Sequence, residues 1–200
     1  RECFVVSASQ QPPAPAIKRE TADAFVNILG ADGFSERHED RAFFSQDIWA
    51  KGAEAAFVAS PKNTEQLAAV ARIAYQNNIA LNPRGAGMSY TKGYTPDREG
   101  VGMLDLSRMD RILEINEADL YVTVEAGCTW SALHDALKGT GLRTPFWGPL
   151  SGLTSTIGGG LSQNNAFFGA GLHGAMSESV LCVTVVLGDG TIIRTGTAGS

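Results

Sequence analysis

Two glycine-rich segments constrain this chain most strongly, because glycine leaves the backbone bare where other residues would place side chains. The segments are Arg84-Gly85-Ala86-Gly87-Met88-Ser89 and Thr156-Ile157-Gly158-Gly159-Gly160-Leu161-Ser162. Bare backbone can approach a bulky anionic ligand closely and direct several N–H groups at it. Together the two segments predict a large phosphate-bearing cofactor that lies between two small lobes.

The composition is that of an ordinary globular protein. Of its 200 residues, 44% are hydrophobic and 18% are charged, which allows a core to be buried. The formal net charge is −5 and the longest basic run is Lys18-Arg19. Binding to nucleic acid or to an anionic membrane surface therefore has no electrostatic support. No stretch of the sequence is long and apolar enough to predict a membrane-spanning helix.

Cysteine and histidine are sparse. Cys3, Cys128 and Cys182 show no C-x-x-C spacing, which argues against a disulfide framework and against a zinc site. We interpret them as buried thiols in a reducing compartment and expect a cytoplasmic protein. Three histidines without clustered carboxylates give no support for metal binding.

The first half of the chain predicts a helix followed by a small β-α-β unit. Residues 1–16 are expected to form an extended lead-in, and residues 31–52 carry no assignable pattern. The expected elements are a helix over 17–29 ended by Gly30, a strand over 55–59, a helix capped by Asn63 or Thr64, and strands over 79–81 and 101–106. We expect a parallel strand pair in this unit.

The second half predicts antiparallel strands and a covering helix. A loop rich in proline and glycine, 145–160, is expected to lead into the second glycine segment. The expected elements are strands over 111–115 and 120–125, a helix capped by Thr129 with Trp130, Leu133 and Leu137 on one face, and a hairpin of 180–187 and 191–195 around Gly188-Asp189-Gly190.

The first glycine segment does not match the dinucleotide-binding or P-loop patterns. A Rossmann fingerprint needs a third glycine where this chain has Tyr90, and then a helix, which Gly93 and Pro96 oppose. No Gly-Lys-Ser/Thr closes the segment as in a P-loop. What remains is an anion-binding loop in which Ser89 adds a hydroxyl and Arg84 adds charge or braces the loop. The alternative is a glycine-rich turn without a ligand.

From about residue 57 to its end, the chain resembles the FAD-binding domain of the vanillyl-alcohol oxidase/p-cresol methylhydroxylase (PCMH-type) family. The resemblance lies in the order and spacing of Val58-Ala59-Ser60-Pro61 with Thr64-Glu65-Gln66-Leu67, Asn82 to Tyr90, Leu104 to Leu113, Val124-Glu125-Ala126-Gly127, Thr156-Ile157-Gly158-Gly159 with Ser162 and Asn164, and Val183 to Gly190.

The resemblance implies an α+β fold with two lobes. A small parallel β-α-β lobe would span 54–115, and a mainly antiparallel lobe with helices would span 116–200. Residues 1–53 would form a lead-in and helical segment. The FAD domain is then expected to be incomplete at its C-terminus, with the substrate domain absent.

The resemblance also implies that FAD is the cofactor and which residues hold it. The backbone of Arg84, Gly85, Ala86, Gly87, Met88 and Ser89 would hold the pyrophosphate. The flavin side of the cleft would be lined or shaped by Pro149, Ser151, Thr154, Thr156, Ile157, Gly158, Gly159, Ser162 and Asn164.

Two departures from the family pattern predict FAD held without a covalent bond. Many members attach the flavin through a histidine of the first glycine loop, where this chain has Met88. Some add a cysteine just before the Thr-Ile-Gly-Gly-like segment, where this chain has Thr154. Neither a thioether nor a threonine is a ready nucleophile for the flavin ring.

The function implied is that of an FAD-dependent oxidoreductase, an oxidase or dehydrogenase. It would transfer a hydride from a hydroxyl-bearing organic substrate to flavin N5 and pass the electrons to an acceptor. No catalytic base can be named. One alternative is an NADPH-dependent reductase on the same scaffold, similar to the UDP-N-acetylenolpyruvylglucosamine reductases. Another is a non-catalytic globular domain without cofactor.

Several other residues allow a functional and a structural interpretation. His134 is expected at the surface or half-buried, and His173 is a weaker candidate for a flavin contact or proton role. The mixed charges of residues 36–41 predict a solvated surface. Five aromatic residues could stack on a flavin but more often pack in a core: Trp130, Phe146, Trp147, Phe167 and Phe168.

Overall fold

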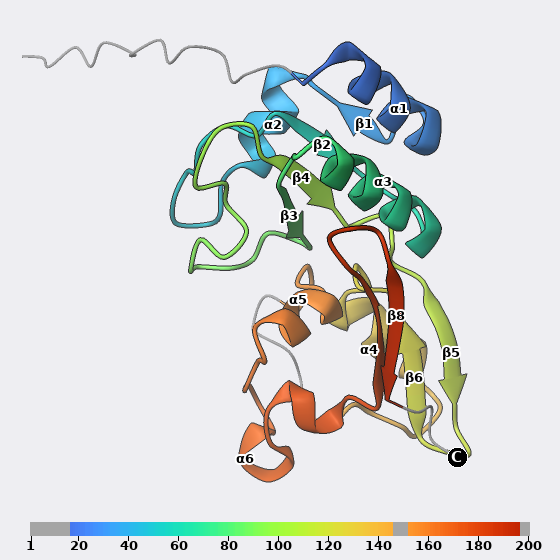
Figure 1. Ribbon diagram of the computed structural model, residues 1–200. Coiled ribbons are helices and arrows are strands. Elements are labelled where there is room, and N and C mark those ends of the chain that lie inside the picture. Colours follow the sequence, from blue (N-terminus) through green and yellow to red (C-terminus); the bar gives the residue numbers. More distant parts are fainter. Residues whose placement is uncertain (1–16, 146–151, 197–200) are drawn as a thin grey trace, which may run out of the picture.

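Two lobes stack one above the other in the computed structural model, which describes residues 17–145 and 152–196 (Figure 1). The upper lobe contains a mixed sheet with helices, and the lower lobe contains two antiparallel strand pairs with short helices. The α+β, two-lobed fold class predicted from the sequence is therefore confirmed.

The upper lobe is built on a four-stranded sheet in the order β1-β2-β4-β3. Its strands are β1 (Phe34–Ser35), β2 (Phe57–Ala59), β3 (Leu81–Arg84) and β4 (Gly102–Asp105). Both β2 and β3 pair in parallel with β4, and β1 pairs antiparallel with β2 at the edge. The expected β-α-β unit is present, with β4 inserted between the two strands that the helix connects.

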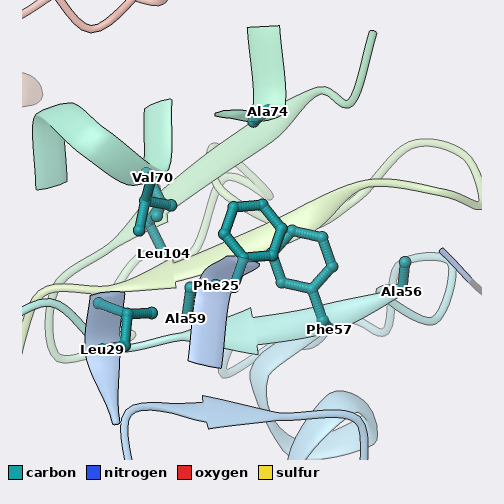
Figure 2. Close-up of a cluster of buried hydrophobic side chains, with 8 residues drawn as sticks. All are labelled: Phe25, Leu29, Ala56, Phe57, Ala59, Val70, Ala74 and Leu104. Carbon is teal, nitrogen blue, oxygen red and sulfur yellow. The ribbon is translucent and has the colours of Figure 1, made fainter. Parts of the chain in front are cut away.

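Two helices pack against each other over this sheet, α1 (Arg19–Leu29) and α3 (Thr64–Gln76). The side chain of Asn63 accepts a hydrogen bond from Gln66 N at 2.8 Å, which caps α3 as expected. Figure 2 shows the core that these helices form with the sheet, where the rings of Phe25 and Phe57 lie 4.9 Å apart. Both rings are fully buried, so α1 shares a core with β2.

The segment without a sequence pattern contains β1 and α2 (His38–Phe44). A two-residue strand and a seven-residue helix are too short to produce a readable periodicity. The mixed charges of residues 36–41 were expected to be solvated, but two of these side chains contact Glu54. Arg41, only 15% exposed in its side chain, pairs with Glu54 at 2.9 Å, and His38 Nδ1 lies 3.1 Å from the same carboxylate.

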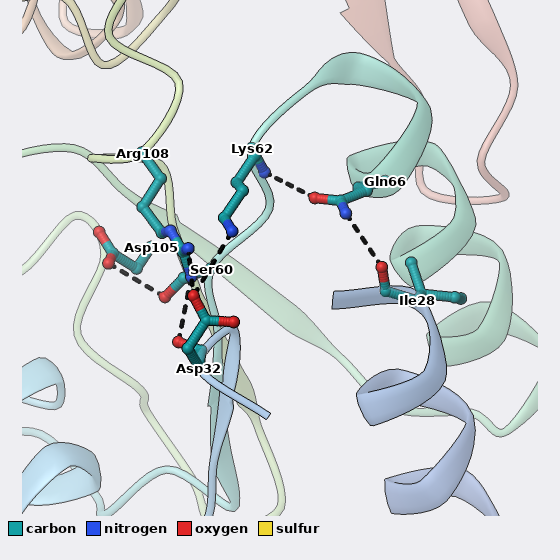
Figure 3. A network of polar contacts seen from close by, with 7 residues as sticks. All are labelled: Ile28, Asp32, Ser60, Lys62, Gln66, Asp105 and Arg108. Atoms are coloured by element: carbon teal, nitrogen blue, oxygen red, sulfur yellow. Dashed lines mark hydrogen bonds and ion pairs between the residues drawn. The ribbon is translucent and has the colours of Figure 1, made fainter. Parts of the chain in front are cut away.

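Polar contacts join the turns at the end of the sheet where β2 and β4 finish, as Figure 3 shows. Asp105, at the end of β4, accepts a hydrogen bond from Ser60 Oγ at 3.1 Å. Arg108 pairs with Asp32 at 2.7 Å, and Lys62 lies 3.4 Å from the same carboxylate. These contacts fix the turn after α1 against the chain that leaves β4.

The lower lobe contains two hairpins. Its elements are β5 (Ile112–Asn116), β6 (Tyr121–Val124), α4 (Trp130–Leu137), α5 (Ile157–Ser162), α6 (Ala170–His173), the 3₁₀ turn η1 (Met176–Ser179), β7 (Cys182–Val186) and β8 (Ile192–Gly196). β5 pairs with β6, and β7 pairs with β8, both antiparallel. β5 therefore belongs to the lower lobe, although the expected lobe boundary at 115 placed most of it in the upper one.

The tip of the β7–β8 hairpin contacts the upper lobe. Gly190, at φ +83°, sits against the backbone oxygen of Ala68, and its own carbonyl accepts a hydrogen bond from Arg72 Nη2 at 3.3 Å. Both residues belong to α3. The lobes are thus joined by the chain between β4 and β5 and by this hairpin tip.

Three expectations about local structure were wrong. The strand expected over 79–81 begins at Leu81 and includes Pro83, because an edge strand does not need the missing N–H of proline. The second glycine segment is the short helix α5 rather than a loop, because Thr156 caps it. Cys182 is half-buried, in an exposed hairpin, while Cys128 is fully buried. Cys3 lies outside the described residues.

We predict that α1 contributes to the stability of the upper lobe through Phe25. Phe25→Ala should lower the free energy of unfolding by about 3–5 kcal/mol, because it leaves a cavity beside Phe57. Tyr75→Ala, at a residue 65% exposed on α3, should change it by no more than about 0.5 kcal/mol. Urea unfolding measures both, and equal effects would contradict a core that includes α1.

Candidate functional site

The first glycine loop leaves the sheet where β3 ends, at Arg84. The chain then passes through turns and bends until β4 begins at Gly102, with no helix between. The exclusion of a Rossmann fingerprint is therefore confirmed. Gly87 has φ +73°, a backbone conformation that is strained for other residues.

The side chain of Arg84 packs against this loop and supports its shape. Its side chain is buried, and its guanidinium lies over the rings of Phe44 at 4.7 Å, Phe43 at 5.1 Å and Tyr94 at 5.5 Å. A Cβ placed on Gly87 would overlap that guanidinium. Of the two roles considered for Arg84, the structure supports the brace, because its positive charge sits under the loop among aromatic faces.

The second glycine segment is held tightly against the start of α4. Ile157 N donates to Cys128 O at 2.8 Å, and Gly158 N donates to Ala126 O at 3.0 Å. A Cβ on Gly158 would approach that carbonyl oxygen to 2.6 Å, so only glycine permits this approach. Thr156 forms an isolated β-bridge with Thr129, and its side chain accepts from Gly159 N at 3.2 Å.

The two glycine segments meet at Gly85 and Thr156. A Cβ placed on Gly85 would overlap Thr156 Oγ1, so the backbone of one lobe touches the helix cap of the other. Figure 1 shows α5 below the end of β3. The expected convergence of the segments at the boundary of the lobes is therefore present in the structure.

Other residues predicted to contact the cofactor occupy varied surroundings. Ala86 and Met88 are half-buried beside the buried Ser89, whose Oγ lies 3.0 Å from Thr91 Oγ1. Ser162 Oγ donates to Gly159 O at 2.9 Å. Thr154 is exposed, whereas Pro149 and Ser151 lie outside the described residues. Their contacts with FAD stay predictions.

The side chain of Asn164 connects the end of the second glycine segment to the next element of the chain. Its Oδ1 accepts a hydrogen bond from Ser177 N at 3.0 Å, which fixes η1 beside the segment. The residue has φ +47°, in the left-handed region that asparagine tolerates better than most residues. Asn164 thus shapes the chain that follows α5.

Ser155 was missed by the sequence analysis. It is buried immediately before the cap residue Thr156, and its Oγ makes no hydrogen bond with the residues that the structure describes. A buried hydroxyl without a partner costs free energy unless a ligand or water satisfies it. Its position next to a helix cap in a glycine-rich segment was the only signal in the sequence.

Two further buried groups stabilise this part of the lower lobe. Hydrogen bonds from Arg111 hold the pKa of Glu125 below its usual value, despite burial. The shorter of these joins Arg111 Nη2 to Glu125 Oε1 at 2.7 Å. Burial raises the pKa of the Cys128 thiol to about 11, with Asp110 and Glu125 adding to the shift. Cys128 is therefore a protonated packing residue at neutral pH.

The histidines and aromatic residues divide as follows. His134 and His173 are both exposed, on α4 and α6. Trp130 is buried against Met176, in agreement with a packing role. Phe167 and Phe168 are 41% and 61% exposed, whereas Phe146 and Trp147 lie outside the described residues.

Two classes of site are not found in the part of the chain that the structure describes. Residues 17–145 and 152–196 contain no group of three histidine, cysteine, aspartate or glutamate side chains placed to hold a metal ion. Within the same ranges, every helix is too short or too polar to cross a membrane.

Comparison with known sequences identifies the matched region. The family described as "FAD binding domain" matches residues 55–196. The chain is 29% identical to the glycolate oxidase subunit GlcD of Bacillus subtilis over 90% of its own length and 38% of that protein. It is 33% identical to a mitochondrial D-lactate dehydrogenase (cytochrome) of Saccharomyces cerevisiae over 68% of its length and 23% of that protein.

Comparison with solved structures shows the same fold. A p-cresol methylhydroxylase structure with bound substrate superposes with a TM-score of 0.77 at 18% identity, over 88% of this chain and 35% of that one. An alkyldihydroxyacetonephosphate synthase superposes with a TM-score of 0.82 at 16% identity, over 94% and 36% of the two chains. The chain thus spans well under half the length of these proteins.

The residues of the described site fit FAD, the cofactor of the matched family. Gly85 and Gly158 pack directly against Thr156 and Ala126, and this packing brings the backbone N–H groups of the two glycine segments near each other, as a shared anionic cofactor requires. Ser155, immediately before the second glycine segment, has a buried Oγ without a partner among the described residues, which a bound cofactor can satisfy.

We predict that Gly85→Ala weakens FAD binding by about tenfold or more, because the new methyl group pushes the glycine segments apart at Thr156. Gly188→Ala, in the β7–β8 turn, is the matched control, since its Cβ would meet no atom within 4 Å. Titration of the apoprotein with FAD, followed by flavin fluorescence, gives both dissociation constants. Equal constants would show that the contact between the lobes does not shape the site.

Proposed function

Because this chain belongs to the FAD-binding domain family, we propose that it forms the FAD-holding part of an oxidoreductase. In this proposal, the enzyme removes a hydride from a hydroxyl-bearing organic substrate. The observation that carries the proposal is the contact of Gly85 with Thr156, which joins the two glycine segments inside the matched region. The proposed location is the cytoplasm, on the grounds of sparse cysteines without C-x-x-C spacing.

The division of labour in such an enzyme is between cofactor and protein. FAD, when bound, supplies a hydride acceptor at flavin N5. The backbone N–H groups of residues 85–89 would hold the pyrophosphate. Arg84 would fix their position, because its buried side chain packs between this loop and Phe44. Thr156 to Gly159, with Ser155, would hold the part of the cofactor that lies against the lower lobe.

A small 2-hydroxy acid is the substrate class that we propose first. Two relatives that cover most of this chain are named for glycolate and D-lactate, both of which carry a hydroxyl next to a carboxylate. Another relative, 29% identical, is named as a decarboxylase of 1'-carboxy-chondrochloren, so the same domain also occurs with other substrates. We assign no catalytic base.

The first test is the visible spectrum of the whole purified protein, followed by acid precipitation. We expect flavin absorbance that moves to the supernatant, because the first glycine loop carries Met88 rather than a nucleophile. Colour that stays in the pellet would contradict non-covalent binding. A folded protein that neither carries nor takes up FAD would contradict the oxidoreductase proposal and favour a non-catalytic domain.

The second test identifies the reductant. Glycolate, D-lactate, L-lactate and NADPH are each added anaerobically to the FAD-loaded protein, and the flavin absorbance is followed. We expect at least one hydroxy acid, and not NADPH, to bleach it. Bleaching by NADPH alone would instead favour the reductase alternative. An aldehyde or ketone product in amounts equal to the flavin reduced confirms hydride removal from the hydroxyl-bearing carbon.

A further inference from the structure

We propose that residues 38–53 position the first glycine loop for FAD, with Asp47 as the main positioning residue. This segment, here called the brace segment, comprises α2 and the chain that follows it. It lies outside the region that the family model matches, which begins at residue 55. Figure 1 shows the chain after α2 beside the long connection between β3 and β4.

Asp47 joins the brace segment to the chain that follows the glycine loop. The residue is buried, with 9% of its surface exposed. Oδ1 accepts from Trp49 N at 2.8 Å and from Ala50 N at 2.7 Å, which closes a turn within the segment. Oδ2 accepts from Lys92 N at 2.8 Å. One side chain therefore fixes both its own turn and a point forty-five residues away in sequence.

The contact falls at a strained part of the loop. Lys92 has φ +56°, a conformation that costs free energy for a side chain other than glycine or asparagine. A hydrogen bond from its N–H to a buried carboxylate offsets that cost. Burial raises the pKa of Asp47, but the N–H donors of Ala50, Lys92 and Trp49 outweigh burial, and the pKa is lowered. The carboxylate is thus ionised at neutral pH.

Tyr94 connects the brace segment to the glycine loop itself. Its hydroxyl lies 2.8 Å from Gly87 O and 3.1 Å from Gln46 O, so it reaches the loop and the brace segment together. The ring is buried and packs with Phe44 of α2. At the far end of the connection, Ala53 N donates to Pro96 O at 2.9 Å.

The base of the loop is held by the same segment. Phe43 and Phe44, on α2, provide two of the three rings that face the Arg84 guanidinium. The loop from Arg84 to Pro96 thus has contacts with the brace segment at its base, middle and end. A loop ordered before it meets its ligand binds more tightly, because less conformational entropy is lost on binding.

This inference rests on FAD as the cofactor and does not depend on the proposed substrate. The key variant is Asp47→Asn in the whole protein. The asparagine carbonyl can still accept from Trp49 N and Ala50 N, but its NH₂ group cannot accept from Lys92 N. The variant therefore removes the contact with the loop and keeps the local turn.

We expect Asp47→Asn to raise the FAD dissociation constant by about tenfold or more, measured by flavin fluorescence. The matched control is Asp119→Asn, whose carboxylate accepts from Asn116 Nδ2 at 3.1 Å in the exposed β5–β6 turn. It should leave FAD affinity unchanged. Tyr94→Phe, which removes only the hydroxyl and retains the ring, should weaken FAD binding by several-fold and serves if Asp47→Asn does not fold.

Hydrogen exchange of the apoproteins distinguishes loop positioning from general destabilisation. We expect peptides covering residues 85–96 to exchange faster in Asp47→Asn, while peptides from α1 and α3 exchange as in the unaltered protein. Unchanged FAD affinity in both Asp47→Asn and Tyr94→Phe would overturn the inference. So would faster exchange spread evenly over the upper lobe. If the unaltered protein itself binds no FAD, the cofactor assignment fails, which is a separate result.

Discussion

The close approach of Gly85 to Thr156 is the contact on which the site depends. It brings a loop from the mixed sheet of the upper lobe into contact with a helix cap of the lower lobe, and no side chain larger than hydrogen fits between them. Around it, each partner is fixed by its own lobe: Arg84 packs under the loop, and Cys128 O and Ala126 O hold the start of α5. The position of one lobe against the other therefore determines the geometry of the site.

The parts of this fold that the sequence revealed are those with local physical causes. Asn63 and Thr129 cap their helices as their side chains indicate, and Gly188 to Gly190 turn the hairpin. The meeting of the glycine segments was expected, because glycine leaves the backbone of both segments free of side chains and able to approach one ligand. Three features were not expected, because each depends on burial or on neighbours distant in sequence. They are the partly buried Arg41–Glu54 pair, the unpartnered Ser155 Oγ and the contact of Asp47 with Lys92 N.

Arg84 illustrates how the same residue type can serve an anion site in two ways. A guanidinium that faces the ligand contributes charge directly. Here the guanidinium lies under the loop, between rings of α2 and Tyr94, so its contribution is to the shape of the backbone above it. The anion would then meet mainly backbone N–H dipoles, which suits a cofactor whose pyrophosphate must be aligned as well as attracted.

The docking of Gly190 on α3 has a mechanical consequence for the two lobes. The chain joins them once between β4 and β5, and the hairpin tip joins them again beside Ala68 and Arg72. The contact of Gly85 with Thr156 adds a further point at which the lobes meet. Each added contact limits the motion of one lobe against the other, so the hairpin tip helps to keep the spacing of the two glycine segments.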